Sequence, residues 1–226
     1  MNFFSKSVLI VIPARKNSVR LKNKNLRKIN GKTLVENSIV FAKKFKKTSN
    51  IVLSTDSEKI KNIVKKNYPE VLIHERQKKF SGSNSSTLIL INRIIKWYRP
   101  KFKKKINSIL LLQPTTPFRN YSLIKKTLIN LNKDKISTNY VSVSSNKLKN
   151  NMNMNLHNKL ITISEKKNPN CYVNGNFYIF RKHMISKNLK KTIMSFRTKG
   201  VIIDRTKYLI DIDNYDDLKF ARKFEK

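Results

Sequence analysis

The sequence predicts a three-layer αβα domain built on a mostly parallel, Rossmann-like sheet. Short runs of aliphatic and β-branched residues recur along the chain, and stretches with apolar residues at helical spacing separate them. Such alternation favours parallel strands with helices on both faces of the sheet. The length of 226 residues fits a single domain, which we expect to span residues 1–226.

The expected strands are short and apolar, and three connections carry one apolar helical face each. Strands are predicted at residues 8–12, 51–53, 71–73, 109–112, 140–143, 177–180, 201–203 and 208–210. The helical faces comprise Leu34, Ser38, Phe41 and Phe45; Leu88, Ile91, Ile95 and Tyr98; and Ile124, Leu128 and Leu131. A closing helix is expected from about Asn214, and residues 147–169 are expected to form a short, irregular, late-inserted arm that serves dimerisation.

Composition limits the class of protein. The chain has 50 Lys and Arg against 13 Asp and Glu, a net charge of +37, which would attract polyanions, nucleic acid included. The basic residues are spread along the whole chain, and Lys, Asn and Ile are abundant together, so we favour compositional bias over a nucleic-acid surface. No apolar run approaches the roughly 20 residues of a membrane span, and the single Cys171 cannot form an internal disulfide. We therefore expect a soluble cytoplasmic protein.

A polar loop with five basic residues, 13–25, follows the first predicted strand. In parallel sheets ligands bind outside the carboxyl ends of the strands, where Arg and Lys can match the oxygens of a triphosphate. The alternative is an ordinary basic surface loop, and the position after strand one favours the binding site. Gly31-Lys32-Thr33 mimics the end of a P-loop, but Leu26 stands where that motif requires a glycine.

Asp211 and Asp213 alternate where the last predicted strand ends, and if the chain stays extended there their carboxylates should share one face. Two oxygen ligands on one face suit Mg²⁺, which keeps several waters and bridges to phosphates. The alternative is a pair of surface acids at a strand end; Asp216 and Asp217 fit the role of helix caps better.

Five segments together resemble the signature of the acylneuraminate (nonulosonic acid) cytidylyltransferase family. They are Pro13-Ala14-Arg15 with Asn17-Ser18, Leu21, Lys24-Asn25-Leu26 and Asn30-Gly31; Ser54-Thr55-Asp56; Leu111 to Arg119, which reads LLQPTTPFR; Asn174-Gly175 with Tyr178-Ile179; and Ile210-Asp211-Ile212-Asp213 with Asp216-Asp217-Leu218. They follow the family's order from residue 7 to the C-terminus.

The resemblance implies transfer of CMP from CTP to the anomeric hydroxyl of an acidic nine-carbon sugar, with release of pyrophosphate, by a Mg²⁺-dependent homodimer. Arg15, Lys24 and Asp211 would be catalytic, and Asp211 and Asp213 would hold the metal. The implied nucleotide-binding residues are Ala14, Arg15, Asn17, Ser18, Lys24, Asn25, Arg76, Ser85 and Ser86. The implied sugar-binding residues are Gln113, Thr115, Thr116, Arg119, Tyr172, Asn174, Gly175 and Tyr178, with Arg119 anchoring the loop that carries the first three.

The chain departs from the family pattern at three places. Val19 replaces a common lysine, although Arg20 could supply the charge; Ser83 replaces an acid; and an arginine is missing before Asn174, which bears on the identity of the sugar. A KDO cytidylyltransferase, a nucleic-acid-binding protein and a catalytically idle relative remain as alternatives. The first loop lacks the Leu-Pro-Gly-Lys-Pro pattern of KDO enzymes and the aromatic residues expected of a nucleic-acid binder.

Overall fold

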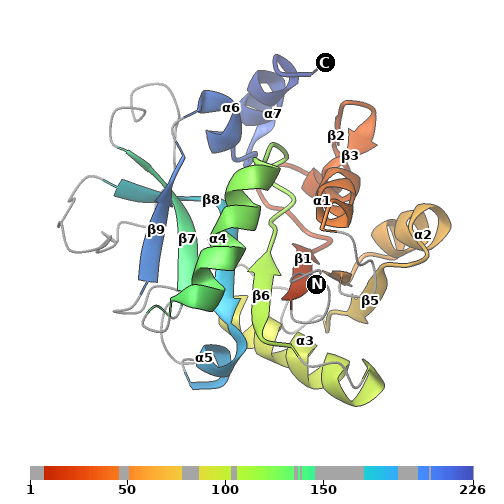
Figure 1. The fold of residues 1–226 in the computed structure, drawn as a ribbon. Coiled ribbons are helices and arrows are strands. Elements are labelled where there is room, and N and C mark those ends of the chain that lie inside the picture. The colour runs from red at the N-terminus through yellow and green to blue at the C-terminus, as the bar shows by residue number, and fades with distance from the viewer. Residues whose placement is uncertain are drawn as a thin grey trace.

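The computed structural model describes residues 8–45, 51–77, 87–102, 106–134, 137, 139–145, 171–187, 198–203 and 205–225. Within these ranges a seven-stranded sheet has the order β5-β4-β1-β6-β8-β7-β9 (Figure 1). The strands are β1 (Val8–Ala14), β4 (Ile51–Thr55), β5 (Leu72–Glu75), β6 (Ser108–Leu111), β7 (Asn139–Ser145), β8 (Cys171–Arg181) and β9 (Thr198–Ile202). β8 runs antiparallel to β6 and β7, and the other pairings are parallel. The predicted mostly parallel αβα architecture is confirmed.

Helices cover both faces of the sheet because the central strands are apolar on both sides. Ile10 and Ile12 of β1 belong to one core cluster with α1 (Leu34–Lys43), α2 (Glu58–Asn67) and α4 (Tyr121–Lys133). Leu9 and Val11 belong to a second cluster with α3 (Thr87–Phe102) and α5 (Lys182–Lys187). The three predicted helical faces are confirmed, since every residue assigned to them is buried.

One predicted strand is wrong. Residues 206–209 form the short helix α6 (Thr206–Leu209), and residues 210–213 follow it without joining any strand of the sheet. The apolar alternation has another cause: Ile210 and Ile212 are buried in a third cluster, against α7 (Tyr215–Arg222). The N–H of Ile212 donates to the carbonyl of Thr115 at 2.8 Å, so a loop provides the backbone partner that a strand would otherwise supply.

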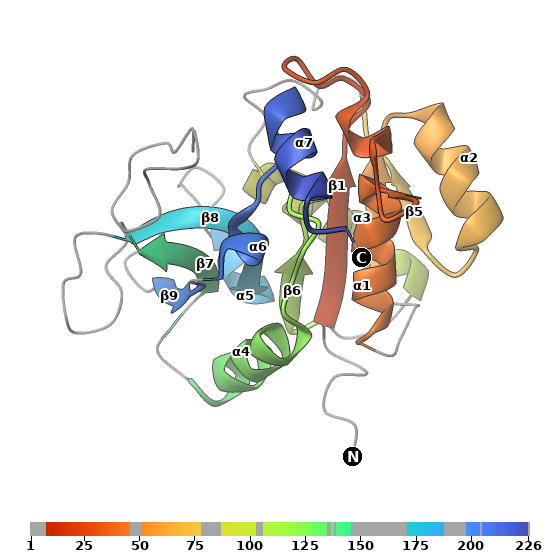
Figure 2. The same ribbon diagram turned by 90° about the horizontal axis from the view of Figure 1, so that it is seen from above.

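The predicted closing helix is confirmed as α7. Asn214 caps it, and Asp217 completes a capping box with the backbone N–H of Asn214. Leu218 and Ala221 of the helix share a buried cluster with Leu34 of α1 and with Ile29 of the hairpin formed by β2 (Lys28–Ile29) and β3 (Lys32–Thr33). The N–H of Asn30 in this hairpin donates to Oε1 of Glu225, just after α7, and Figure 2 shows α7 from above.

The Gly31-Lys32-Thr33 segment is part of this hairpin. Asn30 and Gly31 have φ values of 50° and 71°, as a tight two-residue hairpin turn requires. These residues join two short antiparallel strands, whereas a P-loop connects a strand directly to a helix. The predicted arm at 147–169 lies outside the described residues, and no helix in the described part of the chain is long and apolar enough to cross a membrane.

Candidate active site

A cavity of about 290 Å³ opens beyond the carboxyl ends of β1 and β6. Three segments that are distant in sequence form most of its wall: the loop after β1, the turn after β6 and the segment before α7. The residues that line it are Pro13, Arg15, Ser18, Lys24, Asn25, Arg76, Thr87, Leu90, Gln113, Pro114, Thr115, Asp211 and Asp213. The sheet topology explains this meeting, because parallel strands deliver their following loops to one edge.

Most of the predicted nucleotide residues lie together in this cavity. Its lining includes five of them, namely Arg15, Ser18, Lys24, Asn25 and Arg76. Ala14 is fully buried at the end of β1, Asn17 is exposed, and neither residue belongs to the lining. Ser85 and Ser86 lie outside the described residues.

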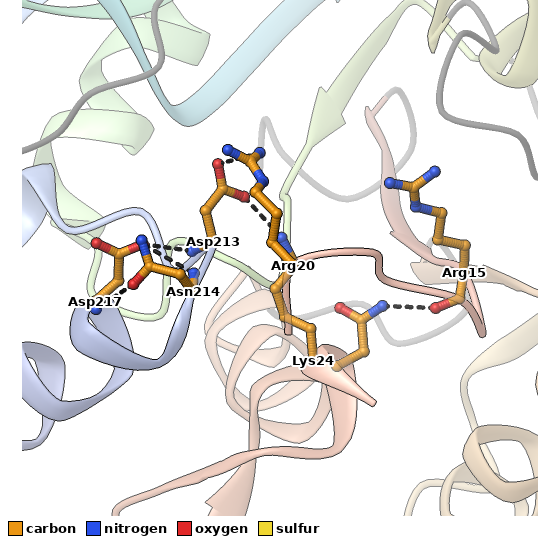
Figure 3. A network of polar contacts seen from close by, with 7 residues as sticks. Arg15, Arg20, Lys24, Asp213, Asn214 and Asp217 are labelled. Atoms are coloured by element: carbon orange, nitrogen blue, oxygen red, sulfur yellow. Dashed lines mark hydrogen bonds and ion pairs between the residues drawn. The ribbon is translucent and has the colours of Figure 1, made fainter. Parts of the chain in front are cut away.

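The loop after β1 is folded back on itself and tied to the neighbouring strand. The buried Asn25 donates from Nδ2 to the carbonyl oxygen of Arg15 at 2.9 Å (Figure 3). The N–H of Lys16 donates to Oδ1 of Asp56, just after β4, at 2.6 Å. The loop then turns through Asn23, at φ 56°, into a single 3-10 turn at Lys24–Leu26. These bonds hold Arg15 and Lys24 at the cavity although no regular element carries the loop between them.

Asp211 and Asp213 both line the cavity, as the alternation predicts, although no sheet strand presents them. Oδ1 of Asp211 is buried and has no hydrogen-bond partner among the described residues. Burial raises the pKa of Asp211, a hydrogen bond from the Thr115 side chain opposes this, and the charge of Asp213 raises the pKa further. A buried carboxylate oxygen without a partner is costly, which marks Asp211 as prepared for a cation or a proton donor.

Asp213 is placed differently, because cations from the first loop meet both of its oxygens. Nη2 of Arg20 lies 2.6 Å from Oδ2, and Nζ of Lys24 lies 2.8 Å from Oδ1 (Figure 3). The N–H of Asp213 donates to Oδ2 of Asp217, so the cap of α7 fixes the backbone at this point. The three side chains form a bridge between the first loop and the segment before α7.

The predicted sugar residues divide into two groups in the turn after β6. Gln113 and Thr115 line the cavity, whereas Thr116 and Arg119 are buried beneath it. The Arg119 guanidinium donates to the carbonyls of Gln113 and Asn176 and to Oγ1 of Thr116. Burial lowers its pKa to about 9, although Asp211 opposes the shift. Arg119 therefore anchors the loop, and the cavity lining does not include Thr116 or Arg119.

Gly175 lies at an irregularity of β8 that brings its backbone to the site. Val141 of β7 pairs with Tyr178 and Val143 pairs with Val173, so residues 174–177 face Ser142 alone. Gly175 has φ +74°, and a Cβ built on it would lie 3.1 Å from Oε1 of Gln113 and 3.6 Å from Oδ2 of Asp211. The position therefore requires glycine for both backbone conformation and space.

The remaining predictions on β8 are less direct. Asn174 is buried, and its Nδ2 has no partner among the described residues. Tyr172 and Tyr178 are absent from the cavity lining; Tyr178 belongs to the core on the α3 side, where burial and the nearby Asp211 raise its pKa. The sequence alone could not show which face of the sheet Tyr172 and Tyr178 would occupy, because the bulge between them shifts the alternation of side chains along β8.

Two residues that sequence reasoning left unassigned also shape the site. Asp56 holds the backbone of Lys16, and its charge opposes the lowering of the Arg76 pKa by burial. Asn176 is fully buried and donates from Nδ2 to the carbonyls of Phe118 and Tyr208 at 2.8 and 2.7 Å, which joins β8 to two loops. Asp56 stood in a recognised motif, whereas nothing local to Asn176 indicated its partners.

Comparisons with known proteins agree with this geometry. The sequence model of the family described as "Cytidylyltransferase" matches residues 9–226. The chain is 29% identical over 227 residues to the CMP-N,N'-diacetyllegionaminic acid synthase of Legionella pneumophila, covering 96% of this chain and 95% of that protein. It is 38% identical over 113 residues to the 3-deoxy-manno-octulosonate cytidylyltransferase of Wigglesworthia glossinidia brevipalpis, covering 50% and 42%.

Among solved structures, the CMP:2-keto-3-deoxy-manno-octonic acid synthetase complexed with CTP superposes with a TM-score of 0.65 at 13% identity, over 96% of this chain and 97% of that one. This likeness confirms the fold. The match of the family model over nearly the whole chain shows more: the protein belongs to the cytidylyltransferase family of nucleotidyltransferase enzymes.

Proposed function

We propose that the protein transfers CMP from CTP to the anomeric hydroxyl of a nonulosonic acid and releases pyrophosphate. The observation that carries the proposal is one cavity whose lining brings Arg15, Lys24 and Arg76 together with Asp211. Cations suit the phosphates of a nucleotide, and a carboxylate suits the hydroxyl that attacks them. Relatives named as CMP-N,N'-diacetyllegionaminic acid synthases, which match this chain over 95–96% of its length, support the choice of sugar.

The attacking oxygen of the sugar would form a bond to the α-phosphorus while the bond to the pyrophosphate leaving group breaks. Negative charge grows on the phosphate oxygens and the leaving group, where Arg15 and Lys24 would stabilise it. Asp211 lines the same cavity, and its carboxylate would accept the hydroxyl proton. Gln113, Thr115 and the backbone at Gly175 would border the sugar, beside Asp211.

We propose Mg²⁺ as the cofactor, with Asp211 as its principal protein ligand. The unpaired, buried Oδ1 of Asp211 fits a hard cation. Asp213 fits less well, because Arg20 and Lys24 already meet both of its oxygens. A bound Mg²⁺ would supply charge neutralisation at the phosphates. The described residues contain no group of three or more His, Cys, Asp or Glu side chains that could hold a metal alone, so phosphate oxygens and water would complete the coordination.

KDO is the second candidate sugar, because the half-length match at 38% identity is to a 3-deoxy-manno-octulosonate cytidylyltransferase. The full-length relatives favour a nonulosonic acid. Homodimerisation and a cytoplasmic location stay predictions, and we propose no nucleic-acid partner.

The test measures pyrophosphate release from CTP with Mg²⁺ against sialic, legionaminic and pseudaminic acids and KDO. Release with one nonulosonic acid, lost in the Asp211→Ala variant, is the expected result. Release with KDO alone would show that the proposed sugar is wrong and that the proposed reaction, transfer of CMP from CTP to an acidic sugar, is right. Silence across the panel from protein that circular dichroism shows to be folded would overturn the proposed activity, and binding to DNA or RNA would then be measured.

A further inference from the structure

The bridge between Arg20, Asp213 and Lys24 joins segments about 190 positions apart in the chain. Lys24 and Asp213 line the cavity, whereas Arg20 reaches Asp213 from outside the lining. Their side chains are 14%, 28% and 50% exposed, in the order Lys24, Asp213, Arg20, so the bridge leads from the cavity to solvent. Leu21, next to Arg20, is buried in the third cluster and fixes the backbone from which Arg20 extends.

Arg20 changes the net charge of the group that Lys24 and Asp213 form. Lys24 paired with Asp213 alone would be a neutral pair, with little net attraction for a triphosphate. Arg20 on the second oxygen leaves the trio with one net positive charge and keeps the carboxylate satisfied. A lysine side chain has many rotamers, and a shared carboxylate that is itself held restricts them.

We propose that Arg20 is a positioning residue for CTP: it holds Asp213, and through Asp213 it keeps Lys24 oriented and electrostatically available to the triphosphate. The inference rests on the proposed function. It assigns Asp213 to the organisation of cations, in place of the metal-ligand role expected from sequence. The neighbouring Val19 is 89% exposed and carries no charge, so of these two adjacent residues only Arg20 is a cation.

A double-mutant cycle on CTP affinity tests the proposal. Isothermal titration calorimetry of CTP in metal-free buffer would compare wild type, Arg20→Ala, Asp213→Asn and the double variant. Arg20→Ala should weaken binding about tenfold, yet change it less than twofold once Asp213 is Asn, because coupled residues are non-additive. Arg20→Lys should recover part of the loss.

Lys22→Ala is the matched control, since it removes one positive charge from the same loop and Lys22 is exposed. It should change the CTP affinity less than twofold. Equal effects of Lys22→Ala and Arg20→Ala would show that the general positive field alone acts, and would overturn the proposal. Additive effects of Arg20→Ala and Asp213→Asn would overturn it as well.

Metal affinity tests independently whether Asp213 is a metal ligand. Electron paramagnetic resonance of Mn²⁺ with the protein should show weakened binding in Asp211→Asn and binding within threefold of wild type in Asp213→Asn. Equal losses of Mn²⁺ affinity in the two variants would show that Asp213 is a metal ligand, and would overturn the inference. Pyrophosphate release by wild type alongside additive CTP affinities would contradict this inference alone, whereas no CTP binding by wild type would overturn it together with the proposed function.

Discussion

Gly175 lies so close to Gln113 that a Cβ on the glycine would sit 3.1 Å from Oε1 of the glutamine side chain. At this point the bulge of β8 lies directly against the turn after β6. Few Cβ atoms approach a neighbour so closely, and the same Cβ would lie 3.6 Å from Oδ2 of Asp211. The absence of a side chain at this position therefore allows the backbone of β8 to approach Gln113 and Asp211.

Gly175→Ala should cost both stability and turnover. An L-residue at φ +74° is strained by about 1–2 kcal/mol, and the methyl group would push Gln113 away from its place. We expect a drop in kcat/KM for the sugar of at least tenfold with CTP affinity within threefold, measured by steady-state kinetics and calorimetry. Gly31→Ala is the control: its φ is +71° with nothing within 4 Å of the Cβ, so it should lose similar stability and keep activity.

Asp211→Asn should abolish most turnover and stabilise the fold near neutral pH. Burial raises the pKa of Asp211 above its ordinary value of 3.8, so the folded wild-type protein binds this proton more readily than the unfolded chain does. The unfolding free energy of the wild type should therefore fall as the pH rises from about 3.8 to the raised pKa of Asp211. The variant has no carboxylate at this position, so this decrease should be absent from it. Urea unfolding at several pH values measures the difference. A variant less stable than wild type at pH 7 would contradict the account.

Arg119→Met should destabilise the protein by about 3 kcal/mol or more, because it leaves the carbonyls of Gln113 and Asn176 without their charged donor. Guanidinium unfolding monitored by circular dichroism measures the cost. Arg205→Met is the surface control, since Arg205 is exposed at the start of α6, and it should stay within about 0.5 kcal/mol of wild type. Equal stability of the two variants would show that the buried network contributes little.

Asp134→Asn should weaken the fold at neutral pH and make little difference in acid. Burial alone would raise the pKa of Asp134, but hydrogen bonds from Lys199, Ser137 and Tyr140 lower it well below its usual range. A carboxylate with a depressed pKa stabilises the folded state above its unfolded pKa, and this stability is lost as the pH falls. The difference in unfolding free energy between wild type and variant should therefore shrink below about pH 4. A constant difference across pH would sink this interpretation.

Much of the fold followed from local patterns. The aliphatic runs at 8–12, 51–53 and 109–112 became parallel core strands, and the helical faces packed where their spacing indicated. The exception was 208–210, where Ile210 and Ile212 alternate as in a strand but pack on α7. Alternation reports which side chains are buried, and it does not report whether the backbone finds a sheet partner.

The candidate site was predicted in part. Motif order placed Arg15, Lys24, Arg76, Gln113 and Asp211 together, and the cavity does contain them. Arg119 anchors the same loop, as the motif implied, whereas Thr116, expected at the sugar, lies buried beneath it. A motif records which residues the site requires, without distinguishing those that face a ligand from those that hold the loop.

The sequence by itself determined the layer architecture, the position of the binding loops and the family, because periodicity and motif order are local properties of the chain. The tertiary structure decided the partners of Asp211 and Asp213. One carboxylate keeps an oxygen unpaired, and the other receives Arg20 and Lys24. Ion pairs between residues about 190 positions apart depend on where the folded backbone brings two loops, and no local pattern contains that distance.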